Sequence, residues 1–184
     1  MAGSVSDLNI KVFEITNTDF YPVNELEELE AVKFSEAYCG HDTFELWCPI
    51  TERNASMLKR GRVLWQGTEA GYVIETIESS FDANKKQKVY DIQGKTLESY
   101  LTRRIIMGTR VYTNTPVHRI IEDLVSRVTD TAGNDPLRII PYLVIEPNND
   151  ITTPSIDYQK TGGELYETIH DLAMIYELGF DTLS

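Results

Sequence analysis

Short runs of alternating apolar and polar side chains fill the first half of the chain, and they constrain its fold more than any other feature. Residues 9–16 read NIKVFEIT, and residues 62–66, 72–79 and 86–93 have a similar pattern. Successive side chains of a β-strand point to opposite faces, so this period of two predicts strands. Six or seven short strands at close spacing are typical of a small antiparallel barrel or sandwich. We therefore expect a β-barrel here.

The segments between these runs fit the same architecture. Apolar residues stand on both faces of residues 44–50, which predicts a strand buried on both sides. Residues 32–38 indicate another strand, whereas residues 17–24 are rich in Asn, Asp and Pro and predict a turn. The acidic residues 25–30 indicate a solvated strand edge or a short turn. The link SFDANKK, residues 80–86, predicts a hairpin.

Helical spacing replaces this alternation in the second half. Thr115 is a good N-cap and Pro116 a favourable first helical residue. The helix that follows is expected to bury one apolar stripe, formed by Val117, Ile120, Ile121, Leu124, Val125 and Val128. Residues 137–145 predict a buried strand interrupted by Pro141, and a last helix is expected to end at Gly179. The prediction is an α+β chain, with a β-barrel domain over residues 8–112 and an α+β domain over residues 113–184. The second domain is expected to be incomplete, because residues 180–184 resemble the start of a strand.

The stretch DIQGKTLESYLTRRII, residues 91–106, contains the letters that end a phosphate-binding loop. Such a loop needs an earlier glycine five residues before Gly94, but Val89 stands there, inside a predicted strand. We therefore expect no nucleotide site. Instead, Gly94 is predicted to turn the chain and Thr96 to cap a helix that starts at Lys95. Arg103 and Arg104 at its far end are candidates for pairing with acidic groups.

Cys39, His41 and Cys48 are potential metal ligands within a short segment, but Cys-x-His without a second close pair is not a structural zinc spacing. Cys48 also belongs to an apolar strand, where a free cysteine acts as a small hydrophobe. We therefore expect no metal and no other cofactor.

No catalytic residue can be assigned either. His118 and His170 stand on predicted helices, and neither has a serine or cysteine nearby in a nucleophile setting. Trp47 and Trp65 lie on predicted strands, where core or interface packing is the simpler role and sugar stacking is the alternative. The expectation is a protein without enzymatic activity.

The net charge of −12, from 29 acidic and 17 basic residues, argues against sustained binding to duplex DNA, which requires a positive footprint. The chain has no apolar run long enough to span a membrane, and we expect no membrane partner. Two cysteines are too few for a disulfide scaffold, which suits a reduced cytoplasmic origin.

Segments along almost the whole chain resemble the N-terminal region of siphophage tail-hub proteins, also called minor tail or tail-associated proteins, and are similar to phage baseplate hub proteins. The most specific part is residues 71–106, with two strands and a following helix that runs into Arg103-Arg104. Weaker matches are TPVHRIIEDLV, residues 115–125, and GGELYETIHDLAMIYELGF, residues 162–180.

The resemblance implies a structural role in the tail tip of a phage or prophage. Such hubs have tail-tube-like β-barrels, form homotrimers in the full-length protein, and connect the tail tube to the tip. The implied partners are copies of the chain, the distal tail protein, the tape measure protein and passing DNA without specific binding. The implied location is the virion tail, assembled in the bacterial host cytoplasm. We expect acidic side chains to line the inner face of the conduit. The alternatives are a cell-wall glycan hydrolase or a carbohydrate-binding module of a tail.

Overall fold

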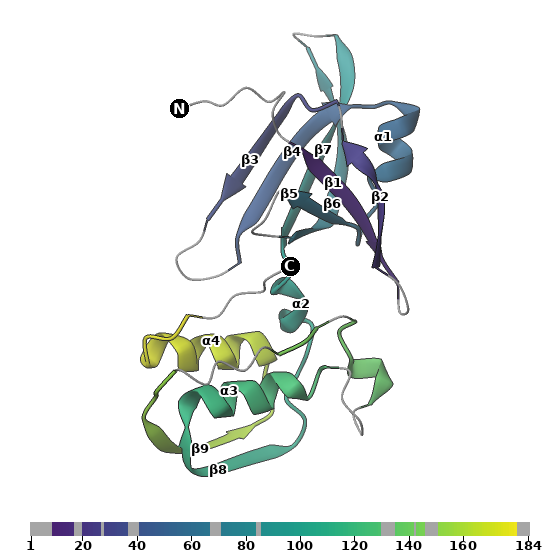
Figure 1. Cartoon of the computed structure of the whole chain (residues 1–184). Helices are drawn as coiled ribbons and strands as arrows, with labels where there is room; N and C mark the ends of the chain where they lie inside the picture. The colour runs from purple at the N-terminus through teal and green to yellow at the C-terminus, as the bar shows by residue number, and fades with distance from the viewer. Residues whose placement is uncertain are drawn as a thin grey trace. The chain divides into compact units, whose positions relative to one another are not determined.

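The computed structural model describes residues 9–16, 20–26, 28–36, 41–66, 71–83, 86–129, 135–141, 143–145 and 151–179. The chain divides into two compact units, and the division falls between Leu97 and Glu98 (Figure 1). The sequence placed it at residue 112 instead. The difference arises because β8 (Thr109–Pro116) pairs with β9 (Ser155–Thr161), so residues assigned to the barrel belong to the second unit.

The first unit is a seven-stranded antiparallel sheet in the order β2-β1-β5-β6-β7-β4-β3. Its elements are β1 (Ile10–Ile15), β2 (Phe20–Leu26), β3 (Ala31–Ser35), β4 (Thr43–Pro49), α1 (Glu52–Met57), β5 (Val63–Gln66), β6 (Gly71–Asp82) and β7 (Gln87–Thr96). The Phe34 ring of β3 lies 5.1 Å from the Tyr72 ring of β6, although β4 and β7 stand between these two strands in the sheet. This contact shows that the sheet curls. However, β2 and β3 remain at the two ends of the ladder, so the predicted barrel is not confirmed. The α+β class with a mostly antiparallel sheet is confirmed.

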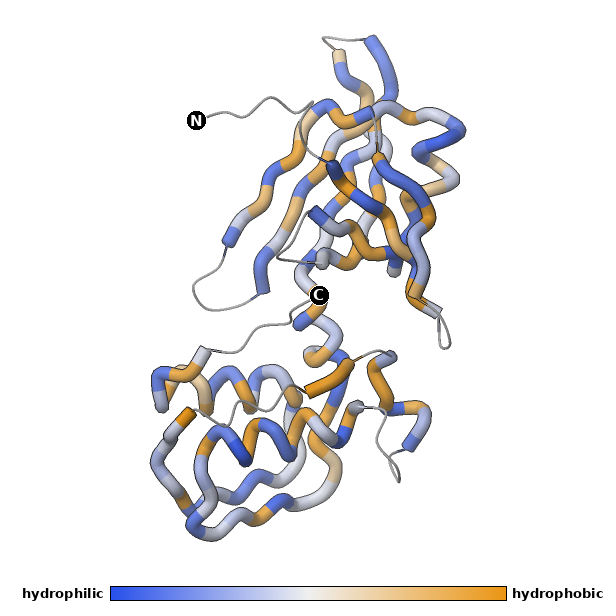
Figure 2. The backbone as a smooth tube through the Cα atoms, viewed as in Figure 1, coloured by the Kyte–Doolittle hydropathy of each residue, from blue (hydrophilic) through white to orange (hydrophobic). Residues whose placement is uncertain are grey.

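The core of the first unit lies on one face of the curled sheet. Orange and blue segments alternate along its strands in Figure 2, as the sequence pattern predicts. On β4, Phe44, Leu46 and Cys48 are buried, whereas the residues between them are half-buried, so β4 is fully buried on one face only. The buried cluster consists of Ile10, Val12, Leu26, Phe44, Leu46, Cys48, Met57, Leu58, Leu64, Tyr72, Ile74 and Ile92.

The turn predicted over residues 17–24 is wrong where the structure describes it, because β2 starts at Phe20. Pro22 cannot donate a ladder hydrogen bond, but it is tolerated since β2 is an edge strand. The pairing register also shifts between Val12 and Phe13, which leaves Val23 as an extra residue on β2. The turn-forming residues therefore mark an irregular edge strand.

The second unit packs two helices against a two-stranded ribbon. Its elements are α2 (Ser99–Thr102), β8, α3 (Val117–Ser126), a 3-10 turn (Pro136–Arg138), β9 and α4 (Leu165–Ile175). The apolar stripe predicted on α3 is confirmed, since Val117, Ile120 and Leu124 are buried. Ile169 and Leu172 of α4 belong to the same core. Among the described residues, no helix has the length and apolar character needed to cross a membrane.

Two predictions in this half are wrong. Residues 137–145 do not form a buried strand where they are described: Pro136–Arg138 is a 3-10 turn, and Leu137 is 91% exposed. The last helix ends at Ile175 rather than at Gly179, because Glu177 takes the left-handed conformation with φ of 54°. The Leu178 N–H then donates to the Ala173 carbonyl oxygen at 2.8 Å, as in a Schellman cap.

Candidate functional site

Gly94, Lys95 and Thr96 lie within β7, so the predicted turn at Gly94 and the helix from Lys95 are both wrong. The helix α2 begins only at Ser99 and has four residues. Gly94 pairs with Phe44 and Ile74, and an added Cβ atom would lie 1.9 Å from the Val73 carbonyl oxygen. The glycine is needed for this close approach between strands, next to the register shift after Ile74. The segment therefore serves architecture and does not form a phosphate-binding loop.

Thr96 does not cap a helix. It is buried at the end of β7, its N–H donates to the Asp42 carbonyl oxygen at 3.0 Å, and its hydroxyl has no hydrogen-bond partner. Of the two polar residues of this motif, Thr96 is therefore buried in packed structure, whereas Lys95 is exposed.

The candidate metal ligands are only partly described, because Cys39 lies outside the described residues. Cys48 is fully buried in β4. Burial, followed by the charges of Glu30 and Glu28, raises the pKa of the Cys48 thiol to about 12, so the thiol stays protonated at neutral pH. Within the described ranges no group of three His, Cys, Asp or Glu residues could hold a metal ion.

His118 and His170 stand on different helices. The Nδ1 atom of His118 on α3 lies 2.8 Å from the hydroxyl oxygen of Thr153, which also accepts the His118 N–H at 3.3 Å. His170 on α4 stacks on Tyr166 with 5.7 Å between ring centroids. His118 thus contacts the segment that precedes β9, and His170 contacts a residue of its own helix.

The two tryptophans do not form a joint sugar-binding platform. Trp47 lies on β4 and Trp65 on β5, and β6 and β7 separate these strands in the sheet. Trp65 packs on Phe13 with 5.8 Å between ring centroids, and Phe13 stacks on Phe20 at 4.8 Å. This aromatic cluster on β1, β2 and β5 favours the packing role over sugar stacking.

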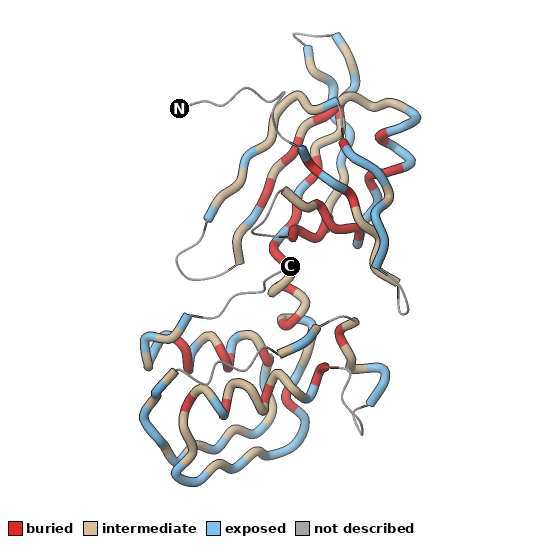
Figure 3. The backbone as a smooth tube through the Cα atoms, viewed as in Figure 1, coloured by how far each residue is buried: buried red, intermediate tan, exposed pale blue. Residues whose placement is uncertain are grey.

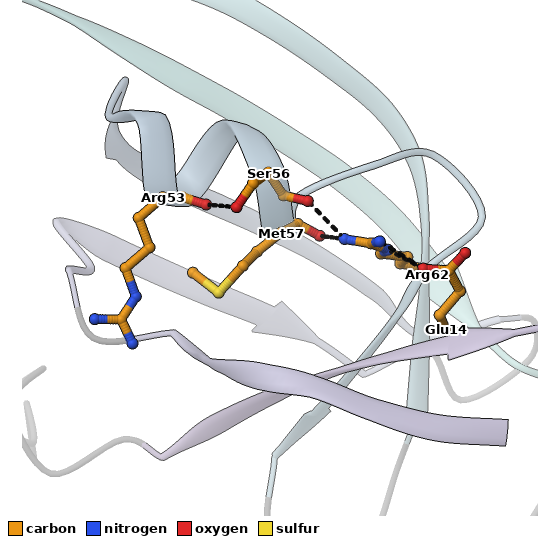
Figure 4. Close-up of polar contacts among 5 residues, drawn as sticks. All are labelled: Glu14, Arg53, Ser56, Met57 and Arg62. Carbon is orange, nitrogen blue, oxygen red and sulfur yellow. Dashed lines mark hydrogen bonds and ion pairs between the residues drawn. The ribbon is translucent and has the colours of Figure 1, made fainter.

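Arg62 of the first unit is buried and makes several hydrogen bonds, and the sequence analysis did not single it out. The Arg62 guanidinium pairs with the Glu14 carboxylate on β1, to which its Nε atom donates at 3.1 Å (Figure 4). Its Nη1 atom donates to the carbonyl oxygens of Ser56 and Met57 at 2.8 and 2.7 Å. These carbonyls end α1, where a cation is favourable. Arg62 thus fastens α1 to β1.

The contacts described for Arg103 and Arg104 are with an aromatic ring and with backbone carbonyl oxygens. Arg103 places its guanidinium 5.0 Å from the ring centroid of Tyr100. Arg104 donates to the carbonyl oxygens of Arg138 and Ile139 at 2.8 and 3.3 Å, and Arg138 donates in return to the Ile105 carbonyl oxygen. These reciprocal bonds hold the segment after α2 against the 3-10 turn.

A further network supports the ribbon of the second unit. The Tyr112 hydroxyl donates to Asp123 on α3 at 2.8 Å, and Arg127 donates to the same carboxylate at 2.9 Å. Burial and the bond to Asp123 raise the pKa of Tyr112 far above its ordinary value. The network joins β8 to α3 and explains why Tyr112 stays a hydrogen-bond donor.

Comparisons with known proteins place this architecture among phage proteins. The model of one family, described as Siphovirus ReqiPepy6 Gp37-like protein, matches residues 12–184. No curated protein matches the sequence. The fold is similar to that of a crystal structure of the prophage tail protein gp18 from Listeria monocytogenes EGD-e, with a TM-score of 0.55 and 14% identity.

That similarity covers 91% of this chain but 46% of the Listeria protein, so the chain spans less than half of its length. Weaker similarities are to a tail protein from Neisseria meningitidis MC58, with a TM-score of 0.47, 12% identity and coverage of 76% of this chain and 41% of that one, and to the Escherichia coli c3393 protein of the type VI secretion system, with a TM-score of 0.41, 12% identity and coverage of 93% and 41%. The family match confirms the resemblance to siphophage proteins. The chain belongs to the family of Siphovirus ReqiPepy6 Gp37-like proteins.

Proposed function

We propose that the chain is a structural component of a phage or prophage tail tip, where it acts as a hub between the tail tube and the tip. The observation that carries this proposal is the family match over residues 12–184. The fold similarity to a prophage tail protein is consistent with it. The full-length protein would act by self-assembly, as a homotrimer that also contacts the distal tail protein and the tape measure protein.

The contacts of the described residues suit a building block. The polar side chains that stand out, Arg62 and Arg104, bind backbone carbonyl oxygens that end or join elements of the fold. The histidines contact a hydroxyl group or an aromatic ring. These residues stabilise local structure, which favours a structural role over catalysis.

The charge also suits a passage for DNA. With a net charge of −12, a ring of copies would repel the DNA backbone and let it slide. Because the Debye length is about 8 Å at physiological salt, only carboxylates close to the DNA would act in this way. We therefore infer that acidic side chains face the conduit.

Electron microscopy of tails labelled with antibody against this chain tests the proposal. We expect label at the tail tip, where the tube ends. Label along the tube, on the head or only on free protein would contradict the hub role. In the control for specific labelling, the tails receive the antibody together with an excess of the purified chain. The label should then disappear from the tails.

A further inference from the structure

Two cations stand directly opposite each other on the ribbon of the second unit, Arg110 on β8 and Lys160 on β9. Because side chains alternate along a strand, both lie on the face that carries Tyr112 and Tyr158, which pack against the core that α3 and α4 share. Exposed and half-buried residues alternate along β9, and the two cations are among the half-buried ones (Figure 3). Like charges directly opposite each other destabilise a sheet. The pair is therefore unfavourable unless a negative charge lies beside it.

The described carboxylates do not supply that charge at contact distance. Within the described ranges, neither Arg110 nor Lys160 forms an ion pair or a side-chain hydrogen bond. This is unusual in a chain that has 29 acidic residues against 17 basic ones. A guanidinium group carries five N–H donors in a planar fork, so Arg110 has strong donors to offer.

The carboxylates on the two helices of this unit are engaged elsewhere. On α3, the Asp123 carboxylate accepts from the Tyr112 hydroxyl at 2.8 Å and from Arg127 at 2.9 Å, so Arg127 already balances its charge. On α4, the Asp171 side chain is 67% exposed, and its Oδ1 atom lies 3.9 Å from the Nδ1 atom of His170. Neither carboxylate lies between the two cations of the ribbon.

Lys160 also lies beside the start of α4. A Cβ atom added to Gly163 would lie 3.2 Å from Cε and 3.5 Å from Nζ of Lys160, and α4 begins two residues later, at Leu165. The N-terminal end of a helix carries a partial positive charge, which disfavours a nearby cation. Glu164 and Glu167 stand in this first turn, but among the described residues neither pairs with Lys160. The ammonium group thus adds to a region that is already positive.

We propose that Arg110 and Lys160 form a binding site for a small oxyanion of the phosphate or sulfate class. The arginine fork can donate to two oxygen atoms of such an ion, and the lysine ammonium can act on a third as a point charge. The bound ion would replace the repulsion between the two cations by attraction to both. A net charge of −12 disfavours the backbone of duplex DNA as the ligand. This site goes beyond the proposed hub role and does not depend on it.

An NMR titration of the full chain with sodium phosphate tests the site, near neutral pH and with the ionic strength held constant by sodium chloride. We expect backbone amide shifts that saturate with a dissociation constant of about 10 mM or lower. They should be confined to residues 109–112 and 158–164, around the two cations. Shifts that grow linearly with phosphate, or that spread over the cations of the whole chain, would overturn the proposal.

Variants of the two cations test whether both hold the ion. Arg110→Gln and Lys160→Gln should each raise the dissociation constant for phosphate at least about tenfold, because each removes charge-assisted hydrogen bonds. Lys95→Gln is the matched control, since Lys95 is an exposed cation on β7 of the first unit. Its dissociation constant should change less than about threefold. Equal effects of Lys160→Gln and Lys95→Gln would contradict the assignment.

Thermal unfolding gives a second readout, which a merely structural role of the pair would move in the opposite direction. Without phosphate, Lys160→Gln should unfold at the same temperature as the wild-type chain or higher, because it removes a like-charge repulsion. Added phosphate stabilises proteins in general, so it should raise the unfolding temperature of the variant less than that of the wild-type chain. A variant that unfolds at a lower temperature in chloride, with the same gain from phosphate, would show that the cations serve the fold alone.

A short DNA duplex at the same total phosphate concentration distinguishes a free ion from a nucleic-acid backbone. We expect it to leave the amides of residues 109–112 and 158–164 unshifted. If the duplex reproduced the saturable shifts, the assignment to a small ion would be wrong. None of these results would move antibody label away from the tail tip, so the hub proposal is judged separately.

Discussion

Gly94 shows how a single residue can be fixed by the approach of two strands. A Cβ atom there would lie 1.9 Å from the Val73 carbonyl oxygen and 2.5 Å from a ring carbon of Phe44. The Val73 carbonyl oxygen belongs to the backbone of β6, so it cannot move without shifting that strand. We therefore expect Gly94→Ala to lower the free energy of unfolding by about 3 kcal/mol or more, as measured by urea denaturation. Gly179→Ala is the control, because no atom lies within 4 Å of its added Cβ. Equal stability of the two variants would contradict this account.

Cys48 makes the stability depend on pH in the alkaline range. Its thiol has a pKa of about 12 in the folded chain, against 9.0 ordinarily, because burial disfavours the thiolate. Above about pH 9 the unfolded chain therefore releases a proton that the folded chain keeps. The free energy of unfolding should fall by about 1.4 kcal/mol per pH unit from this group as the pH rises toward 12.

Urea denaturation of the wild-type chain and Cys48→Ala, at several values between about pH 8 and about pH 11, checks this prediction. The variant loses packing, so only the slopes are compared. Its stability should fall less steeply with pH than that of the wild-type chain. Parallel pH profiles would show that the thiol does not titrate in this way.

Among the elements, α1 depends on the buried arginine at its end. Arg62→Met keeps much of the side-chain volume but leaves the Ser56 and Met57 carbonyls without their donor, and Glu14 without its partner. We expect a loss of about 2–4 kcal/mol in the free energy of unfolding. The control is Arg60→Met, because Arg60 is exposed and donates one bond, to the Glu75 carbonyl oxygen. That variant should lose under about 1 kcal/mol, and similar losses in both would contradict the role of Arg62.

Helices and strands whose own residues show a clear hydrophobic periodicity could be predicted from the sequence. Those that depend on pairing with residues far away in the sequence could not. The strand β4 alternates cleanly and α3 carries one apolar stripe, so local spacing was sufficient. The strand β9 reads SIDYQKT and gains its conformation from pairing with β8, so its mostly polar sequence gave no clear signal.

The same limit applies to the candidate sites. Arg62 and Glu14 are 48 residues apart, and no local spacing could bring them together. The letters Gly-Lys-Thr suggested a turn and a cap because glycine is common in turns and threonine at helix N-caps. The close approach of Gly94 to Val73 exists only after β6 and β7 pair.

At the scale of the whole molecule, each unit has a core of its own. The cluster of the first unit draws on residues between Ile10 and Ile92, and that of the second on residues between Tyr100 and Leu178. Burial of apolar surface is the main force that drives folding. Two separate cores therefore indicate that the chain contains two folding units, with their division between Leu97 and Glu98.

This division predicts which fragments fold. A fragment of residues 98–181 keeps β8, so β9, α3 and α4 retain their packing partner, and it should unfold cooperatively on heating. A fragment of residues 113–181, cut where the sequence pattern changes, loses the first half of β8, which makes four of its six pairs with β9, and the Tyr112 contact to Asp123. It should lack a cooperative transition, because β9 then keeps only two of its six pairs with β8. Circular dichroism against temperature distinguishes the two, and matching transitions in both fragments would place the boundary at residue 112 after all.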